Sequence, residues 1–527
     1  MTANTDTDRY ALLSVYDKKG ILSLARGLID TGFRILSTGG TAAALRQEDI
    51  PVQEVSEYTG FPEILGGRVK TLHPKIHGGI LGRPDRKEDL QEMERQGIRP
   101  IQLLVVNLYP FAKVAADPQS TPDRLVEMID IGGPTMIRAA AKNHAHVGVV
   151  VDPDDYPRVL QEIRSSGTLT PETRIDLARK AFEHTATYDT GIINQWSRLA
   201  PGIDPQPGEP SPLPERLFLA FDKTLDLRYG ENPHQRAAFY RPVGMPPEGL
   251  AGAQKLHGKE LSFNNLLDCD AAWRAVGEFD RPAAVIVKHT NPCGVALGEN
   301  LYQAYDRARQ TDPVSAFGGI VALNRPVDRQ TADAIASTFL ECVVAPEFPE
   351  EALAVLIKKK NIRLLAIEKK NGVDSKSFDL RPLSGSLLAQ EFDSRSGIPA
   401  DARVVTKRKP TDGEWKALDF AWRIVKHVKS NAIVFCRENG TEAIGAGQMS
   451  RVDSVRLARL KAGGSLEGTV VSSDAFFPFR DGVDALADAG ATAVVQPGGS
   501  KRDPEVIAAA DEKNLAMVFT GIRHFRH

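Results

Sequence analysis

The chain has 527 residues, with 66 lysines and arginines against 68 aspartates and glutamates, which gives a formal net charge of −2. Its 42% hydrophobic and 25% charged residues are typical of globular protein and exclude global disorder and a generally basic nucleic-acid binder. At roughly 150 residues per domain, we expect three or four domains.

The first ten residues are polar, and no segment reaches the roughly 20 apolar residues that cross a bilayer. We therefore expect a cytoplasmic protein that does not bind membranes. The cysteines are scattered without a C-x-x-C pair, which predicts free buried thiols rather than a disulfide framework or a thiolate zinc site. They are Cys269, Cys293, Cys342 and Cys436.

In the first 199 residues, apolar segments of strand length alternate with longer segments of helical pattern. The expected strands cover residues 10–15, 33–36, 103–106 and 147–151, and residues 156–196 are expected to be mostly helical. This alternation predicts an α/β domain with a parallel sheet. Residues 200–214 are rich in proline, which predicts a linker and a second region over residues 215–527.

Polar groups follow the expected strands of the first domain, and the carboxyl ends of parallel strands converge on one crevice. Ser14 and Lys18 follow the first strand, and Ser37, Thr38, Gly39 and Gly40 follow the second at a helix start. Free N–H groups and hydroxyls at a helix start can bind a phosphate. The alternative is an ordinary tight connection, which is the commoner meaning of two glycines in a turn.

Two further segments carry polar residues that could reach the same crevice. Residues 66–79 contain Arg68, Lys70 and Thr71 among glycines without a helical or strand period, and form either an anion-binding loop or a basic surface loop. Asn107 and Tyr109 follow the third strand. Asp130 precedes a Gly-Gly turn, where an Asp is usually a helix cap, and we expect it to face the crevice together with Lys142.

After residue 214 the pattern is less regular, with apolar runs at residues 283–287, 319–323, 432–435, 469–472 and 493–495, which predicts a mixed α/β region. The segments VIVKHTNPCGVALG from Val285 and AIVFCRENGTEAIG from Ala432 resemble each other weakly. Both have the pattern of strand, polar turn, glycine and second strand. They suggest a duplicated unit without establishing it.

Many ordered motifs together resemble the family of bifunctional AICAR transformylase/IMP cyclohydrolases over nearly the whole chain. In the first half they are SVYDK from Ser14, STGGT from Ser37, GGRVKTLHP from Gly66, NLYPF from Asn107, and DIGG with AAAKNH from Asp130 to His144. In the second half they are LRYGENPHQ from Leu227, FNNLLD from Phe263, KHTNPCG from Lys288, SAFGG from Ser315, SNA from Ser430, GAGQMSR from Gly445, SSDAFFPFRD from Ser472 and the terminal IRHFRH.

The resemblance implies a methylglyoxal-synthase-like first domain, residues 1–199, that closes formyl-AICAR to IMP. It implies two cytidine-deaminase-like units in residues 215–527 that transfer a formyl group from 10-formyltetrahydrofolate, a reduced folate, to AICAR. It further implies a homodimer whose transformylase site draws residues from both subunits, and no catalytic zinc. The sequence agrees on zinc, because Cys293 is not followed by the second cysteine of a P-C-x-x-C motif.

For formyl transfer, the resemblance assigns His289 as the base, Lys288 to the oxyanion or the N10 leaving group, and Asn431 to the formyl oxygen. It implies AICAR binding by Arg228, Tyr229, Asn265, Glu341, Phe476, Arg523 and His527, with burial of Phe525 expected to anchor the C-terminus. The family's potassium site lies around residues 425–432 and Asp474. Val428 and Ala432 supply no hydroxyl there, so the resemblance leaves potassium binding open.

For cyclisation, the resemblance implies that Lys70 and Tyr109 act on the formyl oxygen and the departing water, and that Asp130 and Lys142 manage protons on the amide. The expected substrate-binding residues are Ser14, Lys18, Ser37, Thr38, Gly39, Gly40, Arg68, Thr71 and Asn107. Two alternatives are a non-catalytic nucleotide or folate sensor, against which the intact catalytic set argues, and a zinc deaminase, which lacks its ligands.

Overall fold

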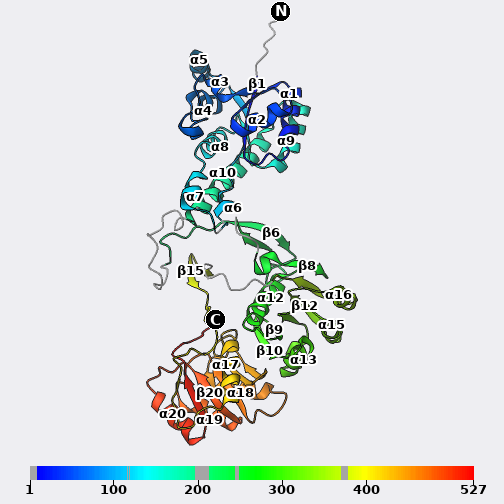
Figure 1. Cartoon of the computed structure of the whole chain (residues 1–527), viewed down its shortest axis with the longest axis vertical. Coiled ribbons are helices and arrows are strands. Elements are labelled where there is room, and N and C mark those ends of the chain that lie inside the picture. The colour runs from blue at the N-terminus through cyan, green and yellow to red at the C-terminus, as the bar shows by residue number, and fades with distance from the viewer. Residues whose placement is uncertain (1–8, 116, 118, 196–212, 244–247, 369–377) are drawn as a thin grey trace, which may run out of the picture. The chain divides into compact units, whose positions relative to one another are not determined.

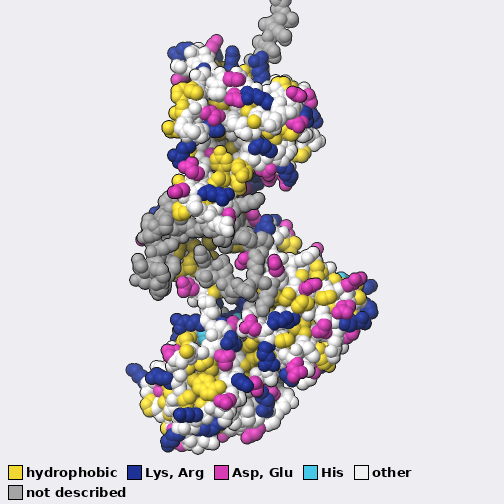
Figure 2. Space-filling view, viewed as in Figure 1, with side chains coloured by type: hydrophobic (Ala, Val, Ile, Leu, Met, Phe, Trp, Pro, Cys, Tyr) yellow, Lys and Arg dark blue, Asp and Glu magenta, His cyan; other side chains and the backbone are white. Residues whose placement is uncertain are grey.

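The computed structural model describes residues 9–115, 117, 119–195, 213–243, 248–368 and 378–527. The chain forms two compact units, which we call unit 1 (residues 1–222 with 242–245) and unit 2 (residues 223–241 with 246–527) (Figure 1). Most of the proline-rich segment that predicts a linker, residues 200–212, lies outside the described residues. Acidic and basic side chains are interspersed over the visible surface (Figure 2), in agreement with the balanced composition.

Unit 1 is built on a five-stranded sheet with the order β3-β2-β1-β4-β5, and every pairing is parallel. The prediction of a parallel sheet is therefore confirmed. The strands are β1 (Arg9–Val15), β2 (Phe33–Ser37), β3 (Gln53–Glu54), β4 (Ile101–Asn107) and β5 (Gly148–Val150). The helices are α1 (Ile21–Asp30), α2 (Gly39–Gln47), α3 (Val55–Thr59), α4 (Pro74–Leu81), α5 (Lys87–Arg95), α6 (Phe111–Ala115), α7 (Pro122–Glu127), α8 (Gly132–Lys142), α9 (Tyr156–Ser166) and α10 (Pro171–Ile193).

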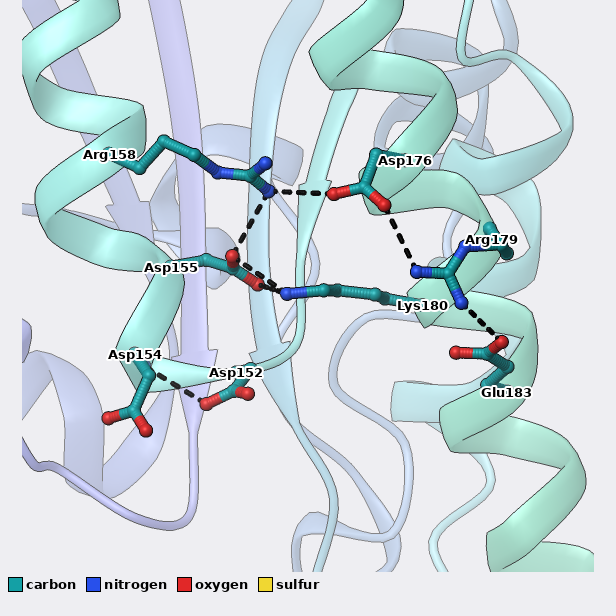
Figure 3. Close-up of polar contacts among 8 residues, drawn as sticks. All are labelled: Asp152, Asp154, Asp155, Arg158, Asp176, Arg179, Lys180 and Glu183. Carbon is teal, nitrogen blue, oxygen red and sulfur yellow. Dashed lines mark hydrogen bonds and ion pairs between the residues drawn. The ribbon is translucent and has the colours of Figure 1, made fainter. Parts of the chain in front are cut away.

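Helices cover both faces of this sheet because the side chains of each strand alternate between two cores. Leu12 of β1 packs with residues of α4, α8 and α10, whereas Leu13 packs with residues of α1 and α9. An ion-pair cluster joins α9 and α10, in which the buried Asp155 binds Lys180 at 2.8 Å and Arg158 at 3.0 Å (Figure 3). The expected helical segment therefore packs beside the sheet, as far as Gln195.

Unit 2 contains one mixed sheet of twelve strands, in the order β16-β21-β20-β19-β17-β18-β10-β9-β11-β12-β13-β8. The strands are β8 (Gln254–His257), β9 (Ala283–Lys288), β10 (Asn291–Leu297), β11 (Gly319–Leu323), β12 (Leu340–Ala345), β13 (Arg363–Ala366), β16 (Arg403–Val404), β17 (Ile433–Arg437), β18 (Gly440–Gly445), β19 (Thr469–Ser473), β20 (Ala491–Gln496) and β21 (Ala516–Phe519). Two separate hairpins are β6 (Phe221–Leu227) with β7 (Ala237–Pro242), and β14 (Phe378–Leu383) with β15 (Ser386–Glu391).

The two halves of this sheet repeat one fold, which confirms the suggested duplication. The half β10-β9-β11-β12-β13-β8 and the half β18-β17-β19-β20-β21-β16 have the same order and the same strand directions, and β10 pairs with β18 at the join. The first repeat contains α12 (Phe263–Val276), α13 (Leu301–Thr311), α14 (Pro313–Ala316), α15 (Arg329–Ala336) and α16 (Glu350–Leu356). The second contains α17 (Asp412–Val425), α18 (Arg451–Lys461), α19 (Arg480–Asp488) and α20 (Asp503–Glu512).

The first helices of the repeats, α12 and α17, share one core on the same face of the twelve-stranded sheet. The other helices form a separate core for each repeat on the opposite face. All four cysteines are free and buried, as predicted. No helix among the described residues is long and apolar enough to cross a membrane.

Candidate functional sites

The start of α2 in unit 1 has the features of an anion-binding site. Thr38 caps α2 with an extended backbone and makes no side-chain capping bond, so N–H groups of the first turn remain available. Two lysines from different loops lie beside it. A Cβ atom on Gly39 would lie 3.1 Å from Lys70 Nζ, and one on Gly40 would lie 3.7 Å from Lys18 Nζ. A side chain at Gly39 would crowd the Lys70 ammonium group, whereas the distance from Gly40 to Lys18 is an ordinary van der Waals contact.

Two of the predicted binding residues at this edge have structural hydrogen bonds. Ser37 is fully buried and donates its hydroxyl to a carbonyl of β1 at 2.6 Å. Asn107 accepts the N–H groups of Tyr16 and Asp17 at 2.6 and 2.9 Å, and thereby holds the loop after β1. The Ser14 hydroxyl lies 3.5 Å from the hydroxyl of the α2 cap. The hydrogen bonds of the Ser37 and Asn107 side chains hold the strand ends and the loop that border the site.

The segment 66–79 is only partly a loop. Residues 74–79 belong to α4, which the sequence analysis did not predict. The helix begins here because Pro74 occupies its first turn and His73 caps it by accepting the Lys75 N–H at 3.1 Å. The part before α4 carries the cations. Lys70 Nζ pairs with Glu63 at 3.1 Å, and the exposed Arg68 pairs with Glu127 at 3.0 Å.

The start of α8 brings Asp130 and Thr71 together. Asp130 accepts the Gly133 N–H at 2.9 Å, and a Cβ atom on Gly132 would lie 2.8 Å from the Thr71 hydroxyl. Burial raises the pKa of Asp130, although the backbone N–H bonds oppose this shift. Tyr109 follows β4 and is 42% exposed, so its hydroxyl is accessible to a ligand. Asp130 is thus both a helix cap and a carboxyl group with a perturbed pKa.

The expectation that Lys142 faces the same crevice as Asp130 is wrong within one chain. Lys142 is the last residue of α8, and Asp130 precedes its first residue. A helix of 11 residues is about 16 Å long at 1.5 Å per residue. Because α8 connects two parallel strands, it runs antiparallel to them, and Lys142 lies at the opposite edge of the sheet.

In unit 2, β9 ends at Lys288, and His289 follows it in a tight turn. Lys288 pairs with Asn291 across the β9–β10 ladder, so His289 and Thr290 form a two-residue loop. Lys288 Nζ donates to the Phe317 carbonyl at 2.7 Å, and the His289 side chain is exposed. Both loop N–H groups donate to the carboxylate of Asp268, at 3.3 and 2.6 Å.

A cavity of about 700 Å³ in the first repeat collects four of the predicted AICAR-binding residues. Arg228, Tyr229, Asn265 and Glu341 line it together with Phe317, whose carbonyl holds Lys288. Through this contact Lys288 adjoins one wall of the cavity. Its other lining includes Lys259, Phe339, the run Lys358, Lys359 and Lys360, and Arg363, which binds Glu341 at 2.5 Å.

The sequence did not predict these additional lining residues. The run of three lysines is a local pattern that could have indicated them, but such a run more often forms a solvated surface. Arg363 gave no signal because its burial depends on the packing of β13 beside β12. Asp268 is the last residue of the motif FNNLLD, and the sequence indicated no separate function for it.

The amide of Asn431 is occupied within this chain. Its Nδ2 donates to the carbonyls of Gln448 and Met449 at 2.9 and 3.2 Å, and its Oδ1 accepts from Arg451 at 2.8 Å. All its hydrogen-bonding groups therefore have protein partners. This arrangement favours a structural role over a hydrogen bond to the formyl oxygen.

The residues around Asp474 do not fit a potassium site. Asp474 is fully buried, and its carboxylate binds the Arg451 guanidinium and the Ser430 hydroxyl. The guanidinium already neutralises this carboxylate, and Val428 and Ala432 have no side-chain oxygen. Among the described residues, no group of three or more His, Cys, Asp or Glu side chains could hold a metal ion.

The C-terminal tail, residues 522–527, is anchored, but the expected anchor Phe525 is wrong. Phe525 is 41% exposed, whereas His524 is 2% exposed and its N–H donates to the Asp474 carbonyl at 3.0 Å. Arg526 accepts the Ser430 N–H at its carbonyl at 2.8 Å. A β-type alternation of side chains explains the difference, because neighbours on either side of Phe525 turn inward.

Three predicted AICAR-binding residues lie in the second repeat and not in the lining of the described cavity. Phe476 is 38% exposed after β19. Arg523 is exposed and its guanidinium lies 4.3 Å from the centre of the Phe525 ring. His527 accepts a hydrogen bond from Arg381 of β14 at its carbonyl, at 3.1 Å. A single chain thus presents two separate sets of the predicted residues.

Two family models match this chain. The model of the family described as AICARFT/IMPCHase bienzyme matches residues 140–461, and the model of the MGS-like domain matches residues 20–135. A solved structure described as the crystal structure of ForH is 41% identical, covers 35% of this chain and 97% of its own, and has a TM-score of 0.33.

Proposed function

The chain belongs to the AICARFT/IMPCHase bienzyme family, and we propose that its two activities reside in different units of the structure. The protein catalyses the two final steps of IMP synthesis, formyl transfer to AICAR and ring closure of formyl-AICAR, and its formyl donor is of the folate type. We assign ring closure to unit 1, where residues 1–199 contain the anion site at α2. We assign formyl transfer to unit 2, residues 215–527.

The observation that carries the second assignment is the hydrogen bond of Lys288 to the carbonyl of Phe317, which lines the cavity together with Arg228 and Tyr229. The AICAR amine is a poor nucleophile because its lone pair is delocalised, so it needs a base during attack. The exposed His289 imidazole would accept that proton. Lys288 would stabilise the oxyanion or protonate N10 of 10-formyltetrahydrofolate as the C–N bond breaks.

The cavity chemistry also fits the nucleotide. Arg228 donates to the Tyr229 hydroxyl at 2.7 Å, and the pair presents a guanidinium fork to a phosphate. The Arg363 contact orients the Glu341 carboxylate toward the ribose or base. Asn265 is 7% exposed and would hold the base through the part of its amide not used as a helix cap.

Ring closure depends mainly on orientation. The α2 start with Lys18, Arg68 and Thr71 would hold the phosphate and ribose, so that the carboxamide nitrogen lies against the formamide carbon. Lys70 and Tyr109 would stabilise the formyl oxygen until it leaves as water. Asp130, whose pKa burial raises, would carry to that oxygen first a proton of the attacking carboxamide nitrogen and then the proton of the formamide nitrogen, so that water leaves as the ring C=N bond forms.

A homodimer would complete the transformylase site. The predicted residues fall into two separate sets within one chain, and this supports the proposal. Phe476, Arg523 and His527 belong to the second repeat and its tail, whereas the cavity belongs to the first repeat. A second chain could bring them to the Arg228 phosphate site. We place the protein in the cytoplasm, without a nucleic-acid or membrane partner, and expect no zinc or potassium.

The direct test is turnover of AICAR with 10-formyltetrahydrofolate, followed by ultraviolet absorbance and by chromatography of IMP. Conversion to IMP supports the proposal. A sensor that retains the fold would bind both ligands in calorimetry but leave AICAR unchanged, and that result would refute catalysis at these residues.

A further inference from the structure

The turn that carries His289 has an unusual backbone. His289 and Thr290 have φ values of 53° and 61°, and positive φ at both loop residues characterises a type I′ hairpin turn. Such turns favour Asn-Gly or Asp-Gly, whereas a β-branched residue at positive φ is an outlier. Strained backbone of this kind persists only where the surroundings fix it, and it is frequent at active sites.

Hydrogen bonds from Asp268, Thr290 and Asn291 hold this turn in its conformation. Asp268 of α12 accepts the N–H of His289 at 3.3 Å and the N–H of Thr290 at 2.6 Å. The His289 carbonyl accepts from the Thr290 hydroxyl at 2.7 Å and from Asn291 at 3.3 Å. The backbone of the turn is bonded while the imidazole is exposed.

The second repeat provides an internal comparison. Its hairpin β17–β18 has a two-residue loop at the matching position, Glu438 and Asn439, flanked by the pair Arg437 and Gly440. Neither loop residue has a positive φ. The position that matches Asp268, the sixth residue of the preceding helix and 21 residues before the loop, is the buried Ala417.

The strained loop and the aspartate therefore occur together in the repeat that carries Lys288 and His289, and both are absent at the matching positions of the other repeat. A purely architectural need would act on both copies, because they share one topology and one joined core. We propose that Asp268 is a positioning residue for formyl transfer, which holds the His289 turn in its strained conformation and so aims the imidazole at the substrate amine.

This proposal rests on the proposed function of His289, and the experiment separates the two. In full-length Asp268→Asn, the amide keeps the size of the side chain but cannot accept both N–H groups. Because misplacement of a catalytic group by about 1 Å can cost about 100-fold, we expect kcat for formyl transfer to fall roughly 10- to 100-fold. KM for AICAR should change less than about twofold, and cyclisation of supplied formyl-AICAR should stay at the wild-type rate.

The matched control is Asp270→Asn, which removes a carboxylate two residues later on α12, where Asp270 binds Arg274 at 2.8 Å. It should transfer formyl at the wild-type rate. A rescue variant separates positioning from general damage. Glycine adopts positive φ without strain, so Thr290→Gly in the Asp268→Asn background should recover about tenfold of the loss.

Non-additivity is the decisive readout, since residues that act as one unit do not lose activity independently. The double variant Asp268→Asn/His289→Ala should be no slower than His289→Ala alone. Wild-type transfer by Asp268→Asn, or an additive loss in the double variant, would overturn the positioning role. Wild-type transfer by His289→Ala would instead refute the proposed base and this proposal with it.

Discussion

Removal of residues 523–527 tests how the C-terminal tail contributes to formyl transfer. The deletion breaks the bonds of His524 N–H to the Asp474 carbonyl, of the Arg526 carbonyl to Ser430, and of the Arg526 side chain to the His427 carbonyl, at 3.0, 2.8 and 2.9 Å. At about 1 kcal/mol for each bond, these contribute about 3 kcal/mol.

Packing adds a further part. The His524 ring lies 4.9 Å from the Trp422 ring, which contributes about 1 kcal/mol, and the His524–Asp393 contact adds little because Asp393 is half exposed. The sum is about 4 kcal/mol. With an unfolding entropy of about 2 cal/mol/K per residue, a unit of roughly 300 residues should lose about 7 °C in Tm.

The assay compares the deletion with point variants in scanning calorimetry and in formyl-transfer kinetics. His524→Ala removes only the Trp422 and Asp393 contacts and should cause about a quarter of the loss in Tm, because the backbone bonds of the tail remain. Arg523→Ala and His527→Ala remove exposed side chains and should leave Tm within about 1 °C, since such changes usually cost under about 0.5 kcal/mol. They should instead raise KM for AICAR. An unchanged Tm in the deletion variant would refute the anchoring by His524 and Arg526.

Four further outcomes are expected. Asp130→Asn keeps an acceptor for the Gly133 N–H but cannot exchange a proton, so cyclisation in a stopped-flow assay should fall at least about 100-fold. Because burial raises the pKa of Asp130, the folded state binds its proton more tightly than the unfolded state does. The free energy of unfolding of the wild type should therefore fall relative to that of Asp130→Asn as the pH rises above about 4. A difference in free energy of unfolding that stays constant with pH in denaturant titrations would contradict this. Glu341→Gln should weaken the Arg363 contact and raise KM for AICAR, with wild-type KM contradicting the cavity assignment. Replacing potassium by sodium should leave formyl transfer unchanged, because Arg451 neutralises Asp474; a strict potassium requirement would contradict this assignment.

Local patterns predicted much of the fold. Four strands of unit 1 were predicted because each is a short apolar run, whereas β3 consists of the polar Gln53 and Glu54 and was not predicted. The similarity between the segments from Val285 and Ala432 corresponds to two matching hairpins. The sequence did not predict the start of α4 at Pro74, because glycines and cations interrupt the few apolar residues of this short helix. Periodicity describes one segment at a time and does not show such capping.

The sites were less predictable because they depend on distances between elements. Lys142 and Asp130 stand close in sequence, yet the length of α8 separates them. Phe525 was expected to be the buried residue of the tail from its apolar side chain, but the partners Asp474 and Ser430 bury its neighbours instead. The lysines and Arg363 of the cavity became evident once the strands were paired.

The central claim is that the two reactions use separate units, and paired full-length variants test it most directly. Lys288→Ala and Lys70→Ala are each assayed for formyl transfer to AICAR and for cyclisation of supplied formyl-AICAR. Lys288→Ala should lose transfer and cyclise at the wild-type rate, and Lys70→Ala should lose about 100-fold or more in cyclisation and still transfer. Loss of both reactions in either folded variant would contradict separate sites.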